Sequence, residues 1–235
     1  MCIRDSLITR PLIDSEDLMG KLFSEGHKII HIPTLKISPA KIDLVDPKKY
    51  DAFIFTSANA IRSLKLINQD KSKFCFCVGA ITEKIVRQNG YSRTISAGGT
   101  VNALKNIISN SSDIDKNKTL AYFCGDHISS DLDLELKKEG FRVDKIINYT
   151  SEKIVDLNEE NNKIILNHPP DIILVYSKRS AESFVELAKK YSLNALMTGS
   201  RVMCISEKVL NVFKQAGWKK LEVFEPGEEL LKIGN

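Results

Sequence analysis

The sequence lacks several features that would set its class at once. No apolar run approaches the roughly 18 residues of a membrane-spanning helix, and the opening stretch, MCIRDSLITRP, lacks the apolar core of a signal peptide. The chain has five cysteines, an odd number without the spacing of a disulfide framework, which fits a reducing compartment. We therefore expect a cytoplasmic protein without a membrane partner.

Signatures of large anionic partners are missing too. The formal net charge is only +4, and no run of Lys and Arg with interleaved aromatic residues is present, so we expect no nucleic-acid partner. Neither G-x-G-x-x-G nor G-x-x-x-x-G-K-[ST] follows an apolar run, which disfavours dinucleotides and nucleoside triphosphates. Binding of small carboxylates remains compatible with this charge.

Metal ligands and activated nucleophiles are equally scarce. His27 and His31 lack a third ligand, and His127 and His168 suit solvent-exposed or capping positions better than a metal site. Cys75 and Cys77 alternate with phenylalanines on a predicted strand and should pack in a core. Because no Ser-His-Asp set is recognisable either, we expect a protein that uses neither a metal nor another cofactor.

What the sequence does contain is a regular alternation of short apolar runs and helix-like segments, which predicts an α/β fold with mostly parallel strands. Six strand-to-helix units stand out. Four of their helices should end at Gly26, Gly90, Gly140 and Gly217, because glycine is favoured just past a helix C-terminus. A strand-like segment follows each of these glycines.

The units form an internal repeat. LITRP…EGHKIIHIP is similar to LAYFCGD…EGFRVDKIINY, FIFTSANAIRSL to ILVYSKRSAESF, and CVGAITEKIVRQNG to CISEKVLNVFKQAG. The order is the same in both halves, which predicts two similar Rossmann-like or flavodoxin-like lobes with parallel sheets. The extended stretches at 33–36 and 149–152 would be two connectors, and the lobes would comprise residues 1–36 with 152–235, and residues 37–151.

Three local expectations complete the outline. The Asn-rich stretch 156–171, which ends in Pro-Pro, should be mostly loop or irregular helix. AGGT at 97–100 is too short for a phosphate loop and should open a helix capped by Thr100. MCIRDS suits the start of a strand poorly, since Arg4, Asp5 and Ser6 are polar, and we interpret it as an appended or misread leader.

Small polar residues recur where the predicted strands end and helices begin. In parallel sheets this edge presents free backbone N–H groups and positive helix ends, which bind anions. Each such residue taken alone is explained as a helix N-cap. Together they predict a cleft for an extended ligand with several anionic groups, and the candidates for binding it are Arg10, Ser57, Asn59, Thr82, Gly125, Asp126, Ser177 and Ser206.

The motifs, in their order and spacing, resemble the uroporphyrinogen-III synthase family. The resemblance extends from Leu7 to PGEELLKI and includes LITRP, YDAFIFTSANAI, CVGAITEKIVRQNG, VYSKRSAESF and CISEKVLNVFKQAGW. It implies a two-lobed fold in which one lobe contains both chain ends. It also implies a substrate, hydroxymethylbilane, a linear tetrapyrrole whose rings each bear an acetate and a propionate.

The resemblance further implies a reaction and its residues. Loss of the terminal hydroxyl as water would give an azafulvene, and closure through a spiro intermediate would invert the last ring. Tyr149, in NYTS, matches the family's candidate proton donor, with packing at the connector as its alternative role. Arg10, Ser57, Thr82 and Ser177 match substrate-binding positions, although Arg10 could instead pair with Asp14 or Glu16, and Ser206 lies where the family varies. The enzyme would be a monomer with transient contact to the enzyme that supplies hydroxymethylbilane.

Two other functions remain open from the residues alone. A two-lobed cytoplasmic protein that binds an anionic small molecule without catalysis would have the same architecture, because a fold does not fix a function. A glycosyl or phosphoryl transferase would require a Gly-rich nucleotide turn or a metal-binding Asp-x-Asp motif. Asp131 and Asp133 have that spacing, but in a helix residues two apart face different directions.

Overall fold

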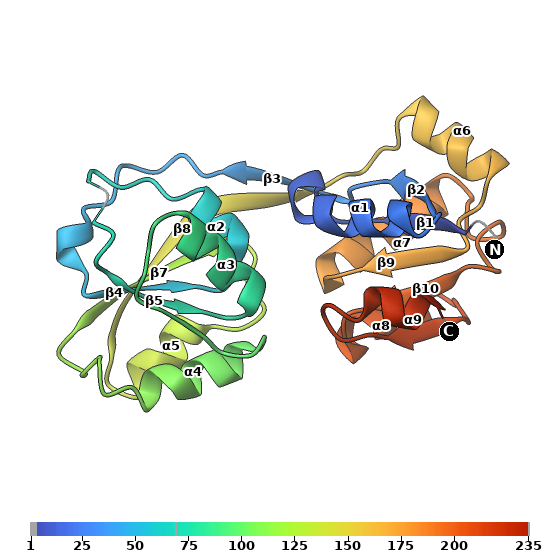
Figure 1. Ribbon diagram of the computed structural model, residues 1–235. Coiled ribbons are helices and arrows are strands. Elements are labelled where there is room, and N and C mark those ends of the chain that lie inside the picture. The colour runs from blue at the N-terminus through green and yellow to red at the C-terminus, as the bar shows by residue number, and fades with distance from the viewer. Residues whose placement is uncertain (1–3, 69, 235) are drawn as a thin grey trace. The chain divides into compact units, whose positions relative to one another are not determined.

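The computed structural model describes residues 4–68 and 70–234. The chain divides into two units: Met1–Lys36 with Glu152–Asn235, here called unit 1, and Ile37–Ser151, called unit 2. Each unit is a sheet flanked by helices (Figure 1). The predicted α/β class with two parallel-sheet halves is therefore confirmed.

Unit 1 contains a five-stranded sheet of order β11-β10-β9-β1-β2 among the described residues, and every neighbouring pair is parallel. Its elements are β1 (Asp5–Ile8), η1 (Leu12–Asp14), α1 (Glu16–Ser24), β2 (Lys28–His31), α6 (Glu159–Asn167), β9 (Ile172–Val175), α7 (Lys178–Lys190), β10 (Arg201–Cys204), α8 (Glu207–Gln215), β11 (Leu221–Val223) and α9 (Glu229–Gly234).

Unit 2 contains a sheet of order β3-β8-β7-β4-β5-β6, in which the pairs from β8 to β6 are parallel. Its elements are β3 (Leu35–Pro39), η2 (Pro47–Lys49), β4 (Ala52–Phe55), α2 (Ala58–Arg62), β5 (Phe74–Cys77), α3 (Ala80–Gln88), β6 (Thr94–Ser96), α4 (Val101–Ser109), β7 (Thr119–Gly125), α5 (Leu132–Lys138) and β8 (Arg142–Lys153). The paired strands β3 and β8 carry the chain across the unit boundaries, so both connectors are extended.

The strands β4, β5 and β9 are apolar at every position because both faces of each sheet are covered. In β4, Ala52 and Ile54 face a core shared with α4 and α5, whereas Phe53 and Phe55 face a core shared with α2 and α3. Figure 1 shows these two pairs of helices on opposite sides of the unit 2 sheet. Cys75 and Cys77 lie in the second of these cores, as predicted.

Helix ends follow the chemistry expected of them. Gly26, Gly90, Gly140 and Gly217 all have positive φ, between 84° and 94°, directly after their helices. Thr100 caps α4, because its hydroxyl accepts a hydrogen bond from the backbone N–H of Ala103 at 3.1 Å. Both predictions are confirmed.

Two expectations are wrong. The stretch 156–171 holds a regular helix, α6, whose first turn is capped by the Asn158 side chain through the Asn161 N–H at 2.7 Å. The first strand begins at Asp5, which pairs with Lys28, and Ser6 is fully buried with its hydroxyl 2.9 Å from His27 Nδ1. Asp5 and Ser6 thus take part in the sheet although they are polar, and residues 1–3 lie outside the described residues.

Candidate functional site

Four of the predicted site residues come together at the carboxyl edge of the unit 2 sheet. Ser57 follows β4, Gly125 ends β7 with Asp126 directly after it, and Tyr149 lies in β8; these three strands are neighbours in the order β8-β7-β4. Parallel pairing brings their ends to one edge of the sheet, where loops and helix N-termini leave room for a ligand. This group is the centre of the candidate site.

A β-bulge sets the direction of Tyr149. The register between β7 and β8 shifts after Cys124, which pairs with Ile147, to Gly125, which pairs with Tyr149. The extra residue in β8 is Asn148, and both it and Tyr149 face the α2 side of the sheet: Asn148 Nδ2 donates to the Ala60 carbonyl, and Tyr149 packs in the core shared with α2 and α3. Bulges of this kind turn a side chain toward a site next to a sheet edge.

The Tyr149 ring lies directly against Gly125. A Cβ atom on Gly125 would be 2.7 Å from both Cε2 and Cζ of the ring and 2.9 Å from the hydroxyl oxygen. Real Cβ atoms do not approach other atoms so closely, so only glycine fits at position 125 while the ring stays in place. The role of Gly125 in this site is therefore to accommodate Tyr149.

The Tyr149 hydroxyl is held in a largely dry environment, since only 9% of the residue is exposed. Burial raises the pKa of the phenol above its ordinary value, while hydrogen bonding with the Ser57 side chain and the Gly125 backbone lowers it to a smaller extent. The nearby Cys124 and Asp126 also raise the pKa of Tyr149. At neutral pH the residue is thus a neutral hydroxyl that can donate a hydrogen bond.

Asp126 is hydrogen-bonded to two residues of β8, Tyr149 and Ser151, which flank Thr150. Its backbone N–H donates to the Tyr149 carbonyl at 3.1 Å, and its Oδ1 accepts from the Ser151 N–H at 3.0 Å. The same Oδ1 lies 3.0 Å from Nδ1 of His127. The carboxylate that the sequence suggested as a substrate ligand is thus already engaged within the protein.

Asn59 and Thr82 lie in the neighbouring helices. Ser57 caps α2 by accepting from the Asn59 N–H at 3.2 Å, and the Asn59 side-chain oxygen accepts from Arg62 at 3.2 Å. Thr82 is in the first turn of α3, which contacts α2, but only 6% of it is exposed. Asn59 therefore lies in the first turn of α2 beside Ser57, whereas Thr82 is mostly covered.

A hydrogen bond that the sequence did not reveal lies beside this group. The Tyr122 hydroxyl, buried in β7, is 3.2 Å from the Thr56 hydroxyl at the end of β4. Register pairs Tyr122 with Ile54, two residues before Thr56, so the long side chain reaches along the sheet to its carboxyl edge. Thr56 was visible in the sequence as a junction residue, but its partner depends on strand register.

The remaining predicted residues lie at the carboxyl edge of the unit 1 sheet. Arg10, Ser177 and Ser206 follow β1, β9 and β10, which are consecutive strands. The Arg10 guanidinium stacks over the Tyr176 ring, 4.5 Å from its centre, and the Tyr176 hydroxyl donates to Glu229 at 3.0 Å. The sequence left an ion pair with Asp14 or Glu16 open as the alternative role of Arg10, and it did not indicate the aromatic face of Tyr176.

The two serines of this edge differ in their roles. Ser177 caps α7 by accepting from the Ser180 N–H at 3.0 Å, which is the local role that the sequence left open. Ser206 occupies the same position before α8 but makes no side-chain capping bond. The hydroxyl of Ser206 is therefore not committed to its helix.

Buried hydroxyls fix the backbone around Arg10 and Ser177. Thr34 Oγ1 is 2.6 Å from Ser180 Oγ, which donates to Thr9 Oγ1 at 3.2 Å, and Thr9 Oγ1 donates to the Leu174 carbonyl at 2.9 Å. Thr9 immediately precedes Arg10, and all three hydroxyl residues are at most 4% exposed. The network ties the ends of β1 and β9 to the first turn of α7.

Comparison with known proteins identifies the family of this chain. Residues 16–228, most of the chain, match the family model of uroporphyrinogen-III synthase HemD. The chain belongs to the uroporphyrinogen-III synthase family. No curated protein matches the chain significantly. Membership favours the enzyme over the non-catalytic binding protein and the transferase that the residues alone left open.

Solved structures agree on the fold of this uroporphyrinogen-III synthase family member. The chain is similar to uroporphyrinogen-III synthetase from Helicobacter pylori 26695, with a TM-score of 0.66 and 15% identity over 99% of this chain and 98% of that one. It is also similar to a mutant uroporphyrinogen III synthase from the extremely thermophilic bacterium Thermus thermophilus, with a TM-score of 0.58 and 14% identity over the same shares. At such identities the likeness concerns the fold.

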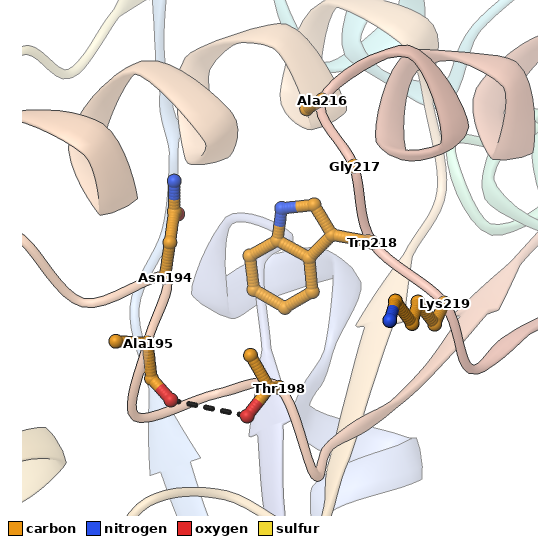
Figure 2. Close-up of a pocket in the computed structure, with 7 residues that line it drawn as sticks. All are labelled: Asn194, Ala195, Thr198, Ala216, Gly217, Trp218 and Lys219. Atoms are coloured by element: carbon orange, nitrogen blue, oxygen red, sulfur yellow. Dashed lines mark hydrogen bonds between the residues drawn. The ribbon is translucent and has the colours of Figure 1, made fainter.

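A cavity elsewhere in unit 1 is not part of the candidate site. It has a volume of about 220 Å³ and lies beside the Trp218 indole ring, with Asn194, Thr198 and Lys219 around it (Figure 2). Thr198 Oγ1 donates to the Ala195 carbonyl at 3.1 Å. These residues precede β10 and β11, so the cavity is at the opposite edge of the sheet from Arg10, Ser177 and Ser206.

In the described parts of the chain, no three His, Cys, Asp or Glu side chains are grouped closely enough to hold a metal ion. Among the same residues, no helix has the length and apolar character needed to cross a membrane.

Proposed function

We propose that this chain converts hydroxymethylbilane to uroporphyrinogen III, with loss of water and inversion of the terminal pyrrole ring. The observation that carries the proposal, within a chain of this family, is the Tyr149 hydroxyl held against Gly125 beside Ser57 at a carboxyl sheet edge. The reaction is that of a cyclising hydro-lyase. We also propose that the enzyme works in the cytoplasm as a monomer, in transient contact with the enzyme that supplies its unstable substrate.

Tyr149 has the properties that loss of the hydroxyl requires. Burial raises its pKa, so the phenol stays protonated at neutral pH and can donate to the departing oxygen. Its rigid surroundings fix the direction of that hydrogen bond, because Gly125 and the bulge position the ring. Positioning of the chain ends and a placed proton donor are sufficient for this chemistry, so we propose no cofactor.

Substrate carboxylates are the proposed ligands of the polar residues at each edge. Arg10 supplies a permanent positive charge, whose orientation the Tyr176 ring supports. Ser206 has a hydroxyl without a capping bond, and the helices after Ser57 and Ser177 present N-terminal N–H groups. Asn59 and Thr82 belong to the same proposal through the first turns of α2 and α3.

Isomer analysis of the product tests the function. The purified protein should give predominantly the type III isomer from fresh hydroxymethylbilane, whereas spontaneous closure gives type I. Tyr149→Phe should lower kcat about 100-fold or more, the usual range for a lost general acid, and should raise the share of type I. Only type I product from folded wild-type protein would refute the proposed function.

The matched control is Tyr91→Phe. Tyr91 is also a buried tyrosine of unit 2 and packs in the same core as Tyr149, but its hydroxyl has no hydrogen-bond partner in the described residues. Its removal should leave kcat and the isomer ratio unchanged. Full activity of Tyr149→Phe would show that another group donates the proton.

A further inference from the structure

His127 forms a pair with Asp126 next to Tyr149 that the proposed mechanism does not use. Its Nδ1 lies 3.0 Å from Asp126 Oδ1, and half of its side chain, 51%, is exposed. A carboxylate can only accept a hydrogen bond, so Nδ1 must carry a proton in this contact. The other ring nitrogen, Nε2, then lies on the side of the imidazole away from Asp126.

The orientation of this imidazole is fixed by its partner. Asp126 is itself held by two further hydrogen bonds to β8, one from its N–H to the Tyr149 carbonyl and one from the Ser151 N–H to Oδ1. A carboxylate anchored in this way restrains both the position and the protonated nitrogen of the ring, as it does for many functional histidines. Within residues 4–68 and 70–234, His127 Nε2 has no hydrogen-bond partner.

The pair lies where an anionic substrate would need a counter-charge. His127 is two residues beyond Gly125, which contacts the Tyr149 ring, at the carboxyl end of β7. The Asp126 carboxylate alone would repel the acetate and propionate groups of a tetrapyrrole at this position. An imidazole that donates from Nδ1 to Asp126 and from Nε2 to a substrate carboxylate would carry the positive charge that offsets both anions.

We propose that His127 Nε2–H binds a carboxylate of the substrate and that Asp126 is the positioning residue for His127. This inference rests on the proposed function and gives Asp126 an indirect role in place of direct contact with substrate. The competing explanation is an exposed ion pair without function, since such pairs often contribute almost nothing. The two explanations predict different values of KM for variants of His127 that keep a donor in the place of only one of the two ring nitrogens.

Two variants separate the nitrogens. The amide of Gln reaches about as far as Nε2, so His127→Gln keeps a donor toward the substrate, whereas the shorter amide of His127→Asn replaces only Nδ1–H. We expect His127→Asn to raise KM for hydroxymethylbilane about tenfold or more, as for loss of a hydrogen bond between charged groups. We expect His127→Gln to raise KM less than about threefold on the same grounds, with kcat and the thermal midpoint near wild type for both.

Asp126→Asn tests the positioning role. It keeps an oxygen that can accept from Ser151 but removes the charge that holds the imidazole. KM should rise in this variant, and adding His127→Asn should raise it little further, because the two residues act as one unit. Additive effects of the two substitutions would overturn this role for Asp126.

Failure of the inference about His127 can be distinguished from failure of the proposed function. Wild-type protein that forms only type I product refutes the proposed function, whatever the variants do. If the wild type forms type III product, a KM for His127→Asn equal to that of wild type overturns the inference, and so does an equal rise of KM in the Asn and Gln variants.

A spectroscopic check uses ¹⁵N-labelled wild type and the product uroporphyrinogen III as the probe. The Nε2 resonance of His127 should shift on binding, and an unchanged resonance at saturation overturns the inference.

Discussion

Gly125→Ala is the sharpest perturbation that the structure offers. No positive φ is required at Gly125, so the backbone itself accepts alanine, and any effect must come from the added methyl group. That methyl would lie 2.7 Å from two atoms of the Tyr149 ring and 2.9 Å from its oxygen. An ordinary contact is about 3.5–4.0 Å, so the ring must move by about 1 Å.

The movement should have two separable consequences. Tyr149 packs with Phe55 and Phe123 in a closed core, and forcing extra volume into such a core costs about 1–3 kcal/mol of unfolding free energy. Displacement of the ring also moves its hydroxyl away from Ser57 and the Gly125 backbone, so kcat should fall at least tenfold, since misplacement by about 1 Å can cost on the order of 100-fold. Urea unfolding measures the loss of unfolding free energy, and the rate of type III product formation at saturating substrate measures the fall in kcat.

A double-mutant cycle identifies the ring as the cause. Tyr149→Leu removes the ring atoms that the new methyl group would meet, so Gly125→Ala in that background should cost much less than in the wild type. Gly199→Ala is the matched control, because a Cβ there has no neighbour within 4 Å and no positive φ is required. Wild-type stability and kcat in Gly125→Ala would refute the argument, as would an equal cost in both backgrounds.

Two predictions concern stability alone. Gly20 is an exposed interior residue of α1 with open space at its Cβ position, so Gly20→Ala should raise the unfolding free energy by about 0.5–1 kcal/mol, measured in urea. Burial, aided by Glu207, raises the pKa of Cys204 from 9.0 to about 12, so the native state keeps a proton that the unfolded chain loses as the pH rises above 9. Stability must therefore fall with rising pH, and wild type should lose about 2 kcal/mol more than Cys204→Ala between about pH 7.5 and about pH 10.5. Equal losses would show that Cys204 is not the titrating group.

Much of the fold could be predicted because its determinants are local. The four glycines after helices and the Thr100 cap depend on the backbone conformation of single residues, and the apolar strands depend on burial from both sides. The error at 156–171 was also local. Asn158 before two acidic residues is a helix start, and this local signal outweighs the Asn-rich composition and the Pro-Pro that follows.

The candidate site was predictable only in part, because its contacts depend on register. Residues at strand ends could be assigned to one edge, which places Ser57, Gly125 and Tyr149 near one another. No pattern in the sequence indicates the bulge after Cys124, and without it Asn148 and Tyr149 would face opposite sides of the sheet. The sequence predicted a solvent-exposed or capping position for His127, and its side chain is half exposed, but its contact with the anchored Asp126 could not be predicted for the same reason.

The bulge also explains how Gly125 can contact the Tyr149 ring while the next residue, Asp126, is anchored on β8. Without the shift, the pairing of Cys124 with Ile147 would continue as Gly125 with Asn148 and Asp126 with Tyr149, so the Asp126 N–H would not face the Tyr149 carbonyl. With the extra residue in β8, the Asp126 N–H reaches the Tyr149 carbonyl and its carboxylate reaches the Ser151 N–H. The same irregularity therefore places the Tyr149 ring over Gly125 and anchors the carboxylate that orients His127. A change that regularises this pairing should affect the proposed proton donor and the proposed carboxylate ligand together.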